Sequence, residues 1–342
     1  MIKIINPLEN PDWNNELPSC PSVSFFHTST WAKVLHASYH YKPLYLTMVG
    51  NGKISVLPVM EVNSPLTGKR GVSLPFTDYC EPIVSNDNQF EEIFTYATEY
   101  GKKNGWRYVE IRGGKKFLDK HEPSENYFGH TLNLKKDTGK IFSSFRDSTK
   151  RNIKKAEKEG IDCEVDYSLN AVNDFYRLNS LTRKEHGLPS QPYYFFKNLY
   201  EEIISKRVGF ISLAKFNGIA IGGNMYFQHG EKVIFKYGAS DKTYHHVRPN
   251  NLAMWTAIKL CCEKGYKYLC FGKTDTNNAG LRQYKLGWGT EEHVIKYFKF
   301  DFLKDSFVKA SPKMSAFQHK IFNKLPISIS NAIGHLLYKH MG

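Results

Sequence analysis

The chain has 342 residues, longer than a single hydrophobic core usually supports, and this length predicts two domains. Its 47 Lys and Arg residues against 33 Asp and Glu give a net charge of +14, so we expect an anionic partner such as nucleic acid, anionic lipid or a phosphorylated substrate. No stretch approaches the roughly 20 apolar residues of a membrane-spanning helix, and the first residues are too polar for a signal peptide. We expect a cytoplasmic protein, with peripheral contact at the inner face of an anionic membrane as an open alternative.

The six cysteines form no CxxC pair and no Cys/His spacing typical of a metal site. We interpret them as reduced core thiols and predict no metal. The sequence also contains no GxSxG elbow, Walker loop or HExxH motif. It therefore gives no indication of serine-hydrolase, nucleotide-hydrolysing or zinc-protease chemistry.

The first half of the chain predicts a strand, a helix, a hairpin, a second helix and a strand. The expected elements are a strand at 2–5, a helix starting near Ser29 or Thr30, hairpin strands at 43–48 and 54–60, a helix at 90–100 and a strand at 108–112. The Asn51-Gly52 step suits a tight hairpin turn, and Gly105 ends the second helix. Between hairpin and helix lies a proline-bearing loop, 73–79, that carries Asp78.

The second half predicts three helices, a hairpin and a strand–helix–strand segment. The expected elements are a basic helix over 139–160, helices at 172–186 and 193–204, hairpin strands at 210–216 and 219–227, a strand near Tyr237, a helix after Arg248, a further strand and an aromatic turn ending at Gly289. The chain ends in a basic amphipathic helical tail. This tail can dock on its own domain, which we favour, or lie on an anionic membrane surface.

The second half repeats the order of the first. Residues 103–109 match 263–269, with glycine, aromatic, basic, tyrosine and aliphatic residues in register, and each half has an Asn-Gly hairpin. A strand followed by a crossover helix and a strand favours a mixed, partly parallel sheet. We predict an α/β (α+β) fold with an N-terminal domain at 1–137, a C-terminal catalytic domain at 138–303 and the tail at 304–342.

Residues 237–289 bring two strand ends and one helix start toward a common place. The helix begins after Arg248-Pro249-Asn250-Asn251, and proline suits a first helical turn because its missing donor is not needed there. Free amides at a helix start attract phosphate or carboxylate, and Arg248 adds further donors. An ordinary capped helix is the alternative reading of the same residues.

Several segments taken together resemble a known family. The segments FRDSTKRNIKKAEKEGI, LTRKEHGLPSQPYYFF, GGNMYF, YGAS with RPNNLAMWTAI, and LRQYKLGWG are similar to the Fem-type transferases of the GNAT superfamily, including relatives encoded with exopolysaccharide genes. The resemblance covers most of residues 25–300 and implies two tandem GNAT-like domains with mixed, partly parallel sheets flanked by helices. It also implies an enzyme that transfers an acyl or aminoacyl group to an amine or hydroxyl.

The resemblance implies substrates as well. The acceptor would be a phosphorylated or lipid-linked glycan precursor of peptidoglycan or exopolysaccharide. The donor would be an acyl-CoA or an aminoacyl-tRNA, with no tightly bound cofactor.

The resemblance implies the site residues Lys285, Lys33 and Asp78, and the residues themselves suggest the further candidates. The catalytic candidates are Lys285, Tyr284 and His246; the donor-binding candidates are Arg248, Asn250 and Asn251; and the acceptor-binding candidates are Lys33, Asp78 and Tyr244. A fixed ammonium such as Lys285 would stabilise the oxyanion that acyl transfer creates. His245 or His246 could take the acceptor's proton, unless the substrate itself does so.

The chain departs from the family at two places. Glu185, His186 and Gln191 replace residues typical of murein-branch enzymes, and Asn251 stands where a donor-binding glycine is expected. The alternative function is a non-catalytic protein of the same fold that binds RNA or an anionic membrane surface.

Overall fold

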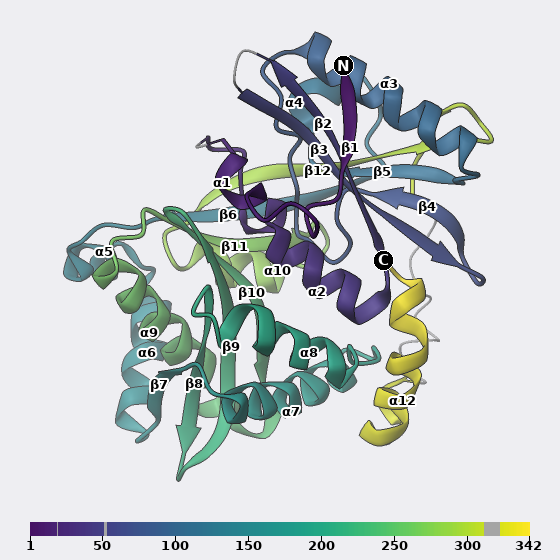
Figure 1. Cartoon of the computed structure of the whole chain (residues 1–342). Coiled ribbons are helices and arrows are strands. Elements are labelled where there is room, and N and C mark those ends of the chain that lie inside the picture. The colour runs from purple at the N-terminus through teal and green to yellow at the C-terminus, as the bar shows by residue number, and fades with distance from the viewer. Residues whose placement is uncertain (19, 51–52, 311–321) are drawn as a thin grey trace. The chain divides into compact units, whose positions relative to one another are not determined.

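The computed structural model describes residues 1–18, 20–50, 53–310 and 322–342 (Figure 1). The described residues form two compact units. Unit 1 contains residues 1–127, 294–310 and 337–342, and unit 2 contains residues 128–293 and 322–336. Each unit contains ranges that are not contiguous in the sequence. The predicted domain boundaries after residues 137 and 303 therefore stay a prediction.

Unit 1 is built on a sheet with helices packed against it. Its strands lie in the order β1 (Ile2–Ile5), β2 (Lys42–Gly50), β3 (Lys53–Ser64), β4 (Gly68–Val72), β5 (Tyr108–Arg112) and β12 (Glu291–Asp301). Only β4 and β5 in this series pair in parallel, and α3 (Asp87–Lys103) connects them across one face (Figure 1). The remaining elements are α1 (Trp13–Glu16), η1 (Phe25–His27), α2 (Ser29–Tyr39), α4 (Lys115–Leu118), β13 (Ser306–Phe307) and η4 (Tyr338–His340).

The strands of unit 2 contain the same kind of crossover. Its strands lie in the order β6 (Glu125–Asn133), β11 (Tyr268–Asp275), β10 (Lys232–Ser240), β9 (Ile219–His229), β8 (Gly209–Phe216) and β7 (Asp162–Asp166). β10 and β11 pair in parallel, and α9 (Pro249–Glu263) connects them. The other helices are α5 (Thr138–Ser144), α6 (Asp147–Lys158), α7 (Leu169–Glu185), α8 (Tyr193–Leu199), η2 (Tyr200–Ile204), η3 (Lys242–Val247), α10 (Ala279–Leu286) and α12 (Ile327–Leu337).

The repeated order seen in the sequence is confirmed. Each repeat runs through a hairpin, a third antiparallel strand, a crossover helix and a parallel strand. Gly105 and Gly265 occupy the same place after the two crossover helices, with φ angles of +70° and +76° that glycine adopts without steric cost. The predicted α/β fold with mixed, partly parallel sheets is therefore present in both halves.

Two segments differ from their sequence-based prediction. The expected helix over 139–160 is split into α5 and α6, because Phe145 is extended, with ψ of 150°. Its ring packs 5.0 Å from that of Trp288 and 5.5 Å from that of Trp255. The expected aromatic turn ending at Gly289 is largely the helix α10, capped by the Asn278 side chain.

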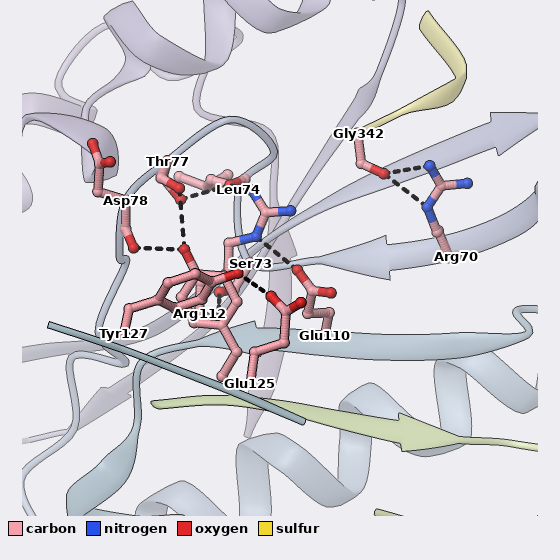
Figure 2. Close-up of polar contacts among 11 residues, drawn as sticks. Arg70, Ser73, Leu74, Thr77, Asp78, Glu110, Arg112, Glu125, Tyr127 and Gly342 are labelled. Atoms are coloured by element: carbon pink, nitrogen blue, oxygen red, sulfur yellow. Dashed lines mark hydrogen bonds and ion pairs between the residues drawn. The ribbon is translucent and has the colours of Figure 1, made fainter. Parts of the chain in front are cut away.

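The C-terminal helix is confirmed over 327–337, and the described residues around it dock on the protein. In unit 2, a side chain at Gly334 would place its Cβ 1.9 Å from the Ser190 carbonyl oxygen, so α12 approaches that backbone closely. In unit 1, Arg70 Nε donates to the Gly342 carbonyl at 2.8 Å (Figure 2). Arg70 Nη2 also donates to the His340 carbonyl at 2.9 Å. In the part of the chain that the structure describes, no helix combines the length and apolarity that crossing a bilayer requires.

Candidate functional site

The start of α9 carries the three donor-binding candidates, Arg248, Asn250 and Asn251. Arg248 precedes the helix with φ of 61°, a left-handed conformation that is uncommon outside glycine, and Pro249 occupies the first turn as predicted. No side chain caps the helix. Arg248 is exposed, whereas Asn251 is buried at 7% exposure. Of these three candidates, Arg248 is the one presented to a soluble donor.

Ser240, at the end of β10, is held by a network of hydrogen bonds. Its backbone N–H donates to Thr182 Oγ1 at 3.0 Å, and Thr182 Oγ1 donates back to the Ser240 carbonyl at 3.1 Å. Asn250 Nδ2 donates to Ser240 Oγ at 3.1 Å, and Ser240 Oγ lies 2.8 Å from His245 Nε2. Asn250 therefore contacts the strand end.

Lys285 is buried on α10, with 3% of its surface exposed. Its ammonium donates to the carbonyl oxygens of Gly272 at 3.2 Å and Lys273 at 3.0 Å, near the end of β11. Gly272 has φ of +67°, which interrupts the regular strand at that point. The lysine predicted to stabilise an oxyanion is thus a fixed internal charge rather than a surface side chain.

His130 interacts with this lysine within unit 2 and belongs to a hydrogen-bonded chain with Glu292 and Arg282. His130 on β6 is fully buried, and its Nε2 lies 3.0 Å from Glu292 Oε2. Arg282 donates to both oxygens of Glu292 at 2.7 Å. Burial lowers the pKa of His130, and the Lys285 charge lowers it further while Glu292 opposes the change. The imidazole is therefore held neutral beside the lysine.

The other second-half candidates differ in environment. Tyr284 is half-buried against the Trp288 ring, and burial raises the pKa of its phenol, so this hydroxyl can donate a hydrogen bond but is a poor base at neutral pH. His246 is exposed, and its Nδ1 lies 3.1 Å from the Thr243 carbonyl oxygen. Tyr244 is half-buried, with its ring 6.2 Å from that of Phe216.

The structure brings the second-half residues to one edge of the unit 2 sheet. β10 and β11 are parallel neighbours, so their carboxyl ends, at Ser240 and Asp275, lie at the same edge. η3 and α9 follow β10, while Lys285 binds the end of β11. Ligands in open α/β sheets bind outside the carboxyl ends of parallel strands. This edge is the candidate active site.

The first-half candidates lie in unit 1. Lys33 is exposed on α2. Asp78 ends a loop in which Leu74 and Phe76 adopt left-handed φ angles of 59° and 60°, an unusual backbone for bulky residues. Tyr297 donates through its hydroxyl to the Asp78 carbonyl at 2.6 Å. This hydrogen bond fixes the loop backbone at Asp78. The role of Asp78 in acceptor binding stays a proposal.

Behind this loop lies a buried charge cluster that the sequence analysis did not identify (Figure 2). Arg112 Nε donates to Glu110 Oε1 at 2.7 Å, and its guanidinium lies 5.6 Å from the centre of the Tyr297 ring. Burial opposes the charge on Arg112, but Glu110 and Tyr297 raise its pKa above the ordinary value. The Tyr127 hydroxyl donates to Glu125. The one sequence signal for this cluster was the alternation of charged and apolar residues along β5. The same alternation is typical of ordinary half-buried strands, so it does not identify a charge cluster.

Within the described ranges, no group of three or more His, Cys, Asp or Glu side chains is placed to hold a metal ion. The exposed guanidinium of Arg248 and the uncapped start of α9 are the features suited to the phosphates of a donor.

Comparison with known proteins relates this geometry to a fold. Residues 143–293 match the family described as an acetyltransferase (GNAT) domain. The structure of FemX aligns with 88% of this chain and 97% of its own, with a TM-score of 0.69 and 15% identity. A tandem GNAT protein from the clavulanic acid biosynthesis pathway aligns with 92% of this chain and 99% of its own, with a TM-score of 0.57 and 8% identity.

A third structure is the C-terminal domain of a putative lysylphosphatidylglycerol synthetase from Agrobacterium fabrum. It aligns with 79% of this chain and 86% of its own, with a TM-score of 0.52 and 10% identity. No match was found among curated proteins. At these identities the likeness concerns the fold, and the predicted Fem-like tandem GNAT fold is confirmed.

Proposed function

Because this chain has a Fem-like tandem GNAT fold, we propose that it is a transferase that moves an acyl or aminoacyl group to an amine or hydroxyl of a cell-envelope precursor. The acceptor class is a phosphorylated or lipid-linked glycan of the peptidoglycan or exopolysaccharide pathways. The protein would work in the cytoplasm, with peripheral contact at the inner face of the membrane, where such precursors are made.

The observation that carries the proposal is the buried ammonium of Lys285 at the end of β11. Attack on a donor carbonyl places negative charge on its oxygen, and a fixed cation shielded from water stabilises that charge more than a mobile surface lysine would. Two backbone carbonyls and the surrounding unit 2 core hold Lys285 in place. No reorganisation is then needed when the oxyanion forms.

The remaining candidates take binding roles in this proposal. Arg248 and the start of α9, with Asn250 and Asn251 forming its first turn, would receive donor phosphates from acyl-CoA or the end of an aminoacyl-tRNA. Lys33, Asp78 and Tyr244 keep the acceptor-binding role that was predicted from the sequence. Tyr284 would donate a hydrogen bond near the reacting carbonyl, and His245 or His246 would take the acceptor's proton. The acceptor attacks the donor directly in a ternary complex.

A transfer assay tests the proposal. The purified protein is incubated with labelled acyl-CoAs or aminoacyl-tRNAs and a lipid-linked glycan fraction, and products are identified by mass. We expect an acceptor whose mass increases by one acyl or aminoacyl group, only when protein and the matching donor are both present. Donor hydrolysis alone, or no product with any donor, would contradict the proposal.

A second function has one specific observation in its favour. On α6, Arg151, Lys154, Lys155 and Lys158 are exposed and share a helical face. A purely charged face of this kind suits a phosphate backbone, because membrane-surface helices also present apolar side chains. RNA binding that weakens steeply with salt, together with no transfer in the assay above, would favour a non-catalytic binding protein.

A further inference from the structure

We propose that Ser240 and His245 form a proton relay that takes the acceptor's proton at the carboxyl edge of the unit 2 sheet. The proposal rests on the transfer function proposed above and adds the residues that handle the proton. Its basis is the 2.8 Å contact between Ser240 Oγ and His245 Nε2 at the end of β10. Both residues belong to the edge that carries Arg248 and the Lys285 contacts.

Ser240 is fixed more firmly than a turn requires. Two hydrogen bonds with Thr182 hold its backbone, and Asn250 Nδ2 donates to its Oγ at 3.1 Å. Ser240 is 6% exposed, so the hydroxyl orientation is determined by these partners rather than by bulk water. A hydroxyl held in this way can accept a proton from the acceptor substrate and donate its own hydrogen to His245 Nε2.

The relay requires one direction for this hydrogen bond. Asn250 donates into one lone pair of Ser240 Oγ, and the hydroxyl hydrogen can be donated to another acceptor. Among the described residues, His245 Nε2 lies within hydrogen-bond distance, and its role as donor or acceptor depends on the tautomer. In the relay Nε2 accepts, and a neutral His245 carries its hydrogen on Nδ1. With the Asn250 amide reversed, its oxygen would take the hydroxyl hydrogen and His245 would carry hydrogen on Nε2 instead.

The relay connects the buried serine to solvent. His245 is an exposed residue, and its ring contacts Ser240 Oγ through Nε2. His246 has the opposite arrangement, since its Nδ1 meets the Thr243 carbonyl and its ring lies outside the serine network. The structure therefore favours His245 over the predicted His246 as the base.

The chemical step balances without a further reactant. The acceptor's nitrogen or oxygen attacks the donor carbonyl carbon, and its proton moves to Ser240 Oγ as the Ser240 hydrogen moves to His245 Nε2. The carbonyl oxygen becomes negative and is stabilised by Lys285. The bond to the donor's sulfur or oxygen then breaks, and the leaving group takes one proton back through the same pair or from water.

The tautomer of His245 tests the relay without any substrate. In protein labelled with ¹⁵N at histidine and studied at alkaline pH, long-range proton–nitrogen NMR distinguishes the two neutral tautomers, and His245→Gln assigns the signals. We expect hydrogen on Nδ1, and an Nε2 signal that moves in Ser240→Ala. Hydrogen on Nε2, or an Nε2 signal unaffected by Ser240→Ala, would overturn the relay, whether or not transfer has been found.

Kinetics tests the role in the reaction. General acid–base groups contribute about 100-fold or more, so Ser240→Ala and His245→Gln should each lower kcat by about that factor with little change in KM. The solvent deuterium isotope effect on kcat should shrink in both variants. Matched controls are Ser205→Ala and His36→Gln, exposed residues whose side chains each bond to one backbone carbonyl.

The outcomes separate this inference from the proposed function. Wild-type protein that transfers no acyl group contradicts the function, while the tautomer result still decides the hydrogen-bond direction. Wild-type protein that transfers normally, with Ser240→Ala and His245→Gln equally active and folded, removes the relay and leaves the function standing.

Discussion

Arg112 is the clearest case of a single residue that stabilises unit 1 through charge. Its side chain is 14% exposed and that of Glu110 is 19% exposed, so neither ion is fully hydrated. Removing one partner of such a pair leaves the other poorly solvated. We predict that Arg112→Met lowers the free energy of unfolding by about 2–3 kcal/mol, measured by urea denaturation.

The matched control is the exposed pair of Lys102 and Asp305 in the same unit, with side chains 54% and 67% exposed. Lys102→Met should cost less than about 0.5 kcal/mol, because exposed pairs contribute little. The double variant Arg112→Met/Glu110→Gln should be less destabilised than the sum of its single variants. Equal losses in the buried and exposed pairs would contradict the prediction.

The lowered pKa of His130 leads us to predict that the stability of the protein depends on pH. Its pKa is lowered in the folded protein, so the unfolded chain binds a proton more readily and the free energy of unfolding falls as pH drops through the ordinary histidine range near 6.5. His130→Gln lacks this contribution, and its stability should fall less between about pH 7.5 and 5.5. Urea denaturation of both proteins across this window measures the difference.

Glu292, which faces His130, does not mask this effect. Arg282 lowers the pKa of its carboxyl, so its contribution is present above the ordinary glutamate range and is lost only as pH falls below about 4.3. A difference between wild type and His130→Gln between about pH 7.5 and 5.5 therefore belongs to the histidine. Identical pH slopes for the two proteins would show that His130 titrates as it does in the unfolded chain.

At the scale of elements, α12 depends on one glycine. Gly334 lets the helix approach the Ser190 carbonyl so closely that an added Cβ would lie 1.9 Å from its oxygen. We predict that Gly334→Ala separates α12 from this backbone, although alanine favours helices by about 1 kcal/mol over glycine. Faster trypsin cleavage at Lys324 measures the change.

Ala332→Ser on the exposed side of the same helix is the control and should be cleaved at the wild-type rate. If Gly334→Ala resists trypsin as well as wild type does, the close approach does not anchor the helix.

Elements with strong local patterns were predictable, and those determined by distant contacts were not. The strand at Ile2–Ile5 and the strand at Tyr108–Arg112 were predicted at their observed bounds. The break at Phe145 was not predicted, because the rings that Phe145 packs against, Trp255 and Trp288, lie far along the chain. The helix α10 was expected as a turn, since its glycines and aromatics resemble turn composition.

The same division applies to the candidate site. The resemblance placed Lys285 in the chemistry, but not its burial, which depends on the carbonyls of Gly272 and Lys273. The relay residues were harder to predict from the sequence, because the Ser240 network joins Thr182 on α7 to Asn250 on α9. Sequence spacing gives no sign of such a contact.

At the scale of the whole molecule, two similar halves have taken different side chains at the same strand end. β5 and β11 follow equivalent crossover helices, yet β5 ends in Arg112 with its ion pair, while β11 presents, before its end at Asp275, the carbonyls that bind Lys285. This difference supports the proposal that the second half carries out the transfer.

The single-turnover rate of acyl transfer in Lys285→Met tests this account most directly. Methionine keeps the length of the buried side chain and removes its charge, and Lys206→Met at an exposed position of the same unit is the control. We predict a rate lowered by roughly 100-fold or more in Lys285→Met and a wild-type rate in the control. A folded Lys285→Met protein that transfers at the wild-type rate would contradict the central claim.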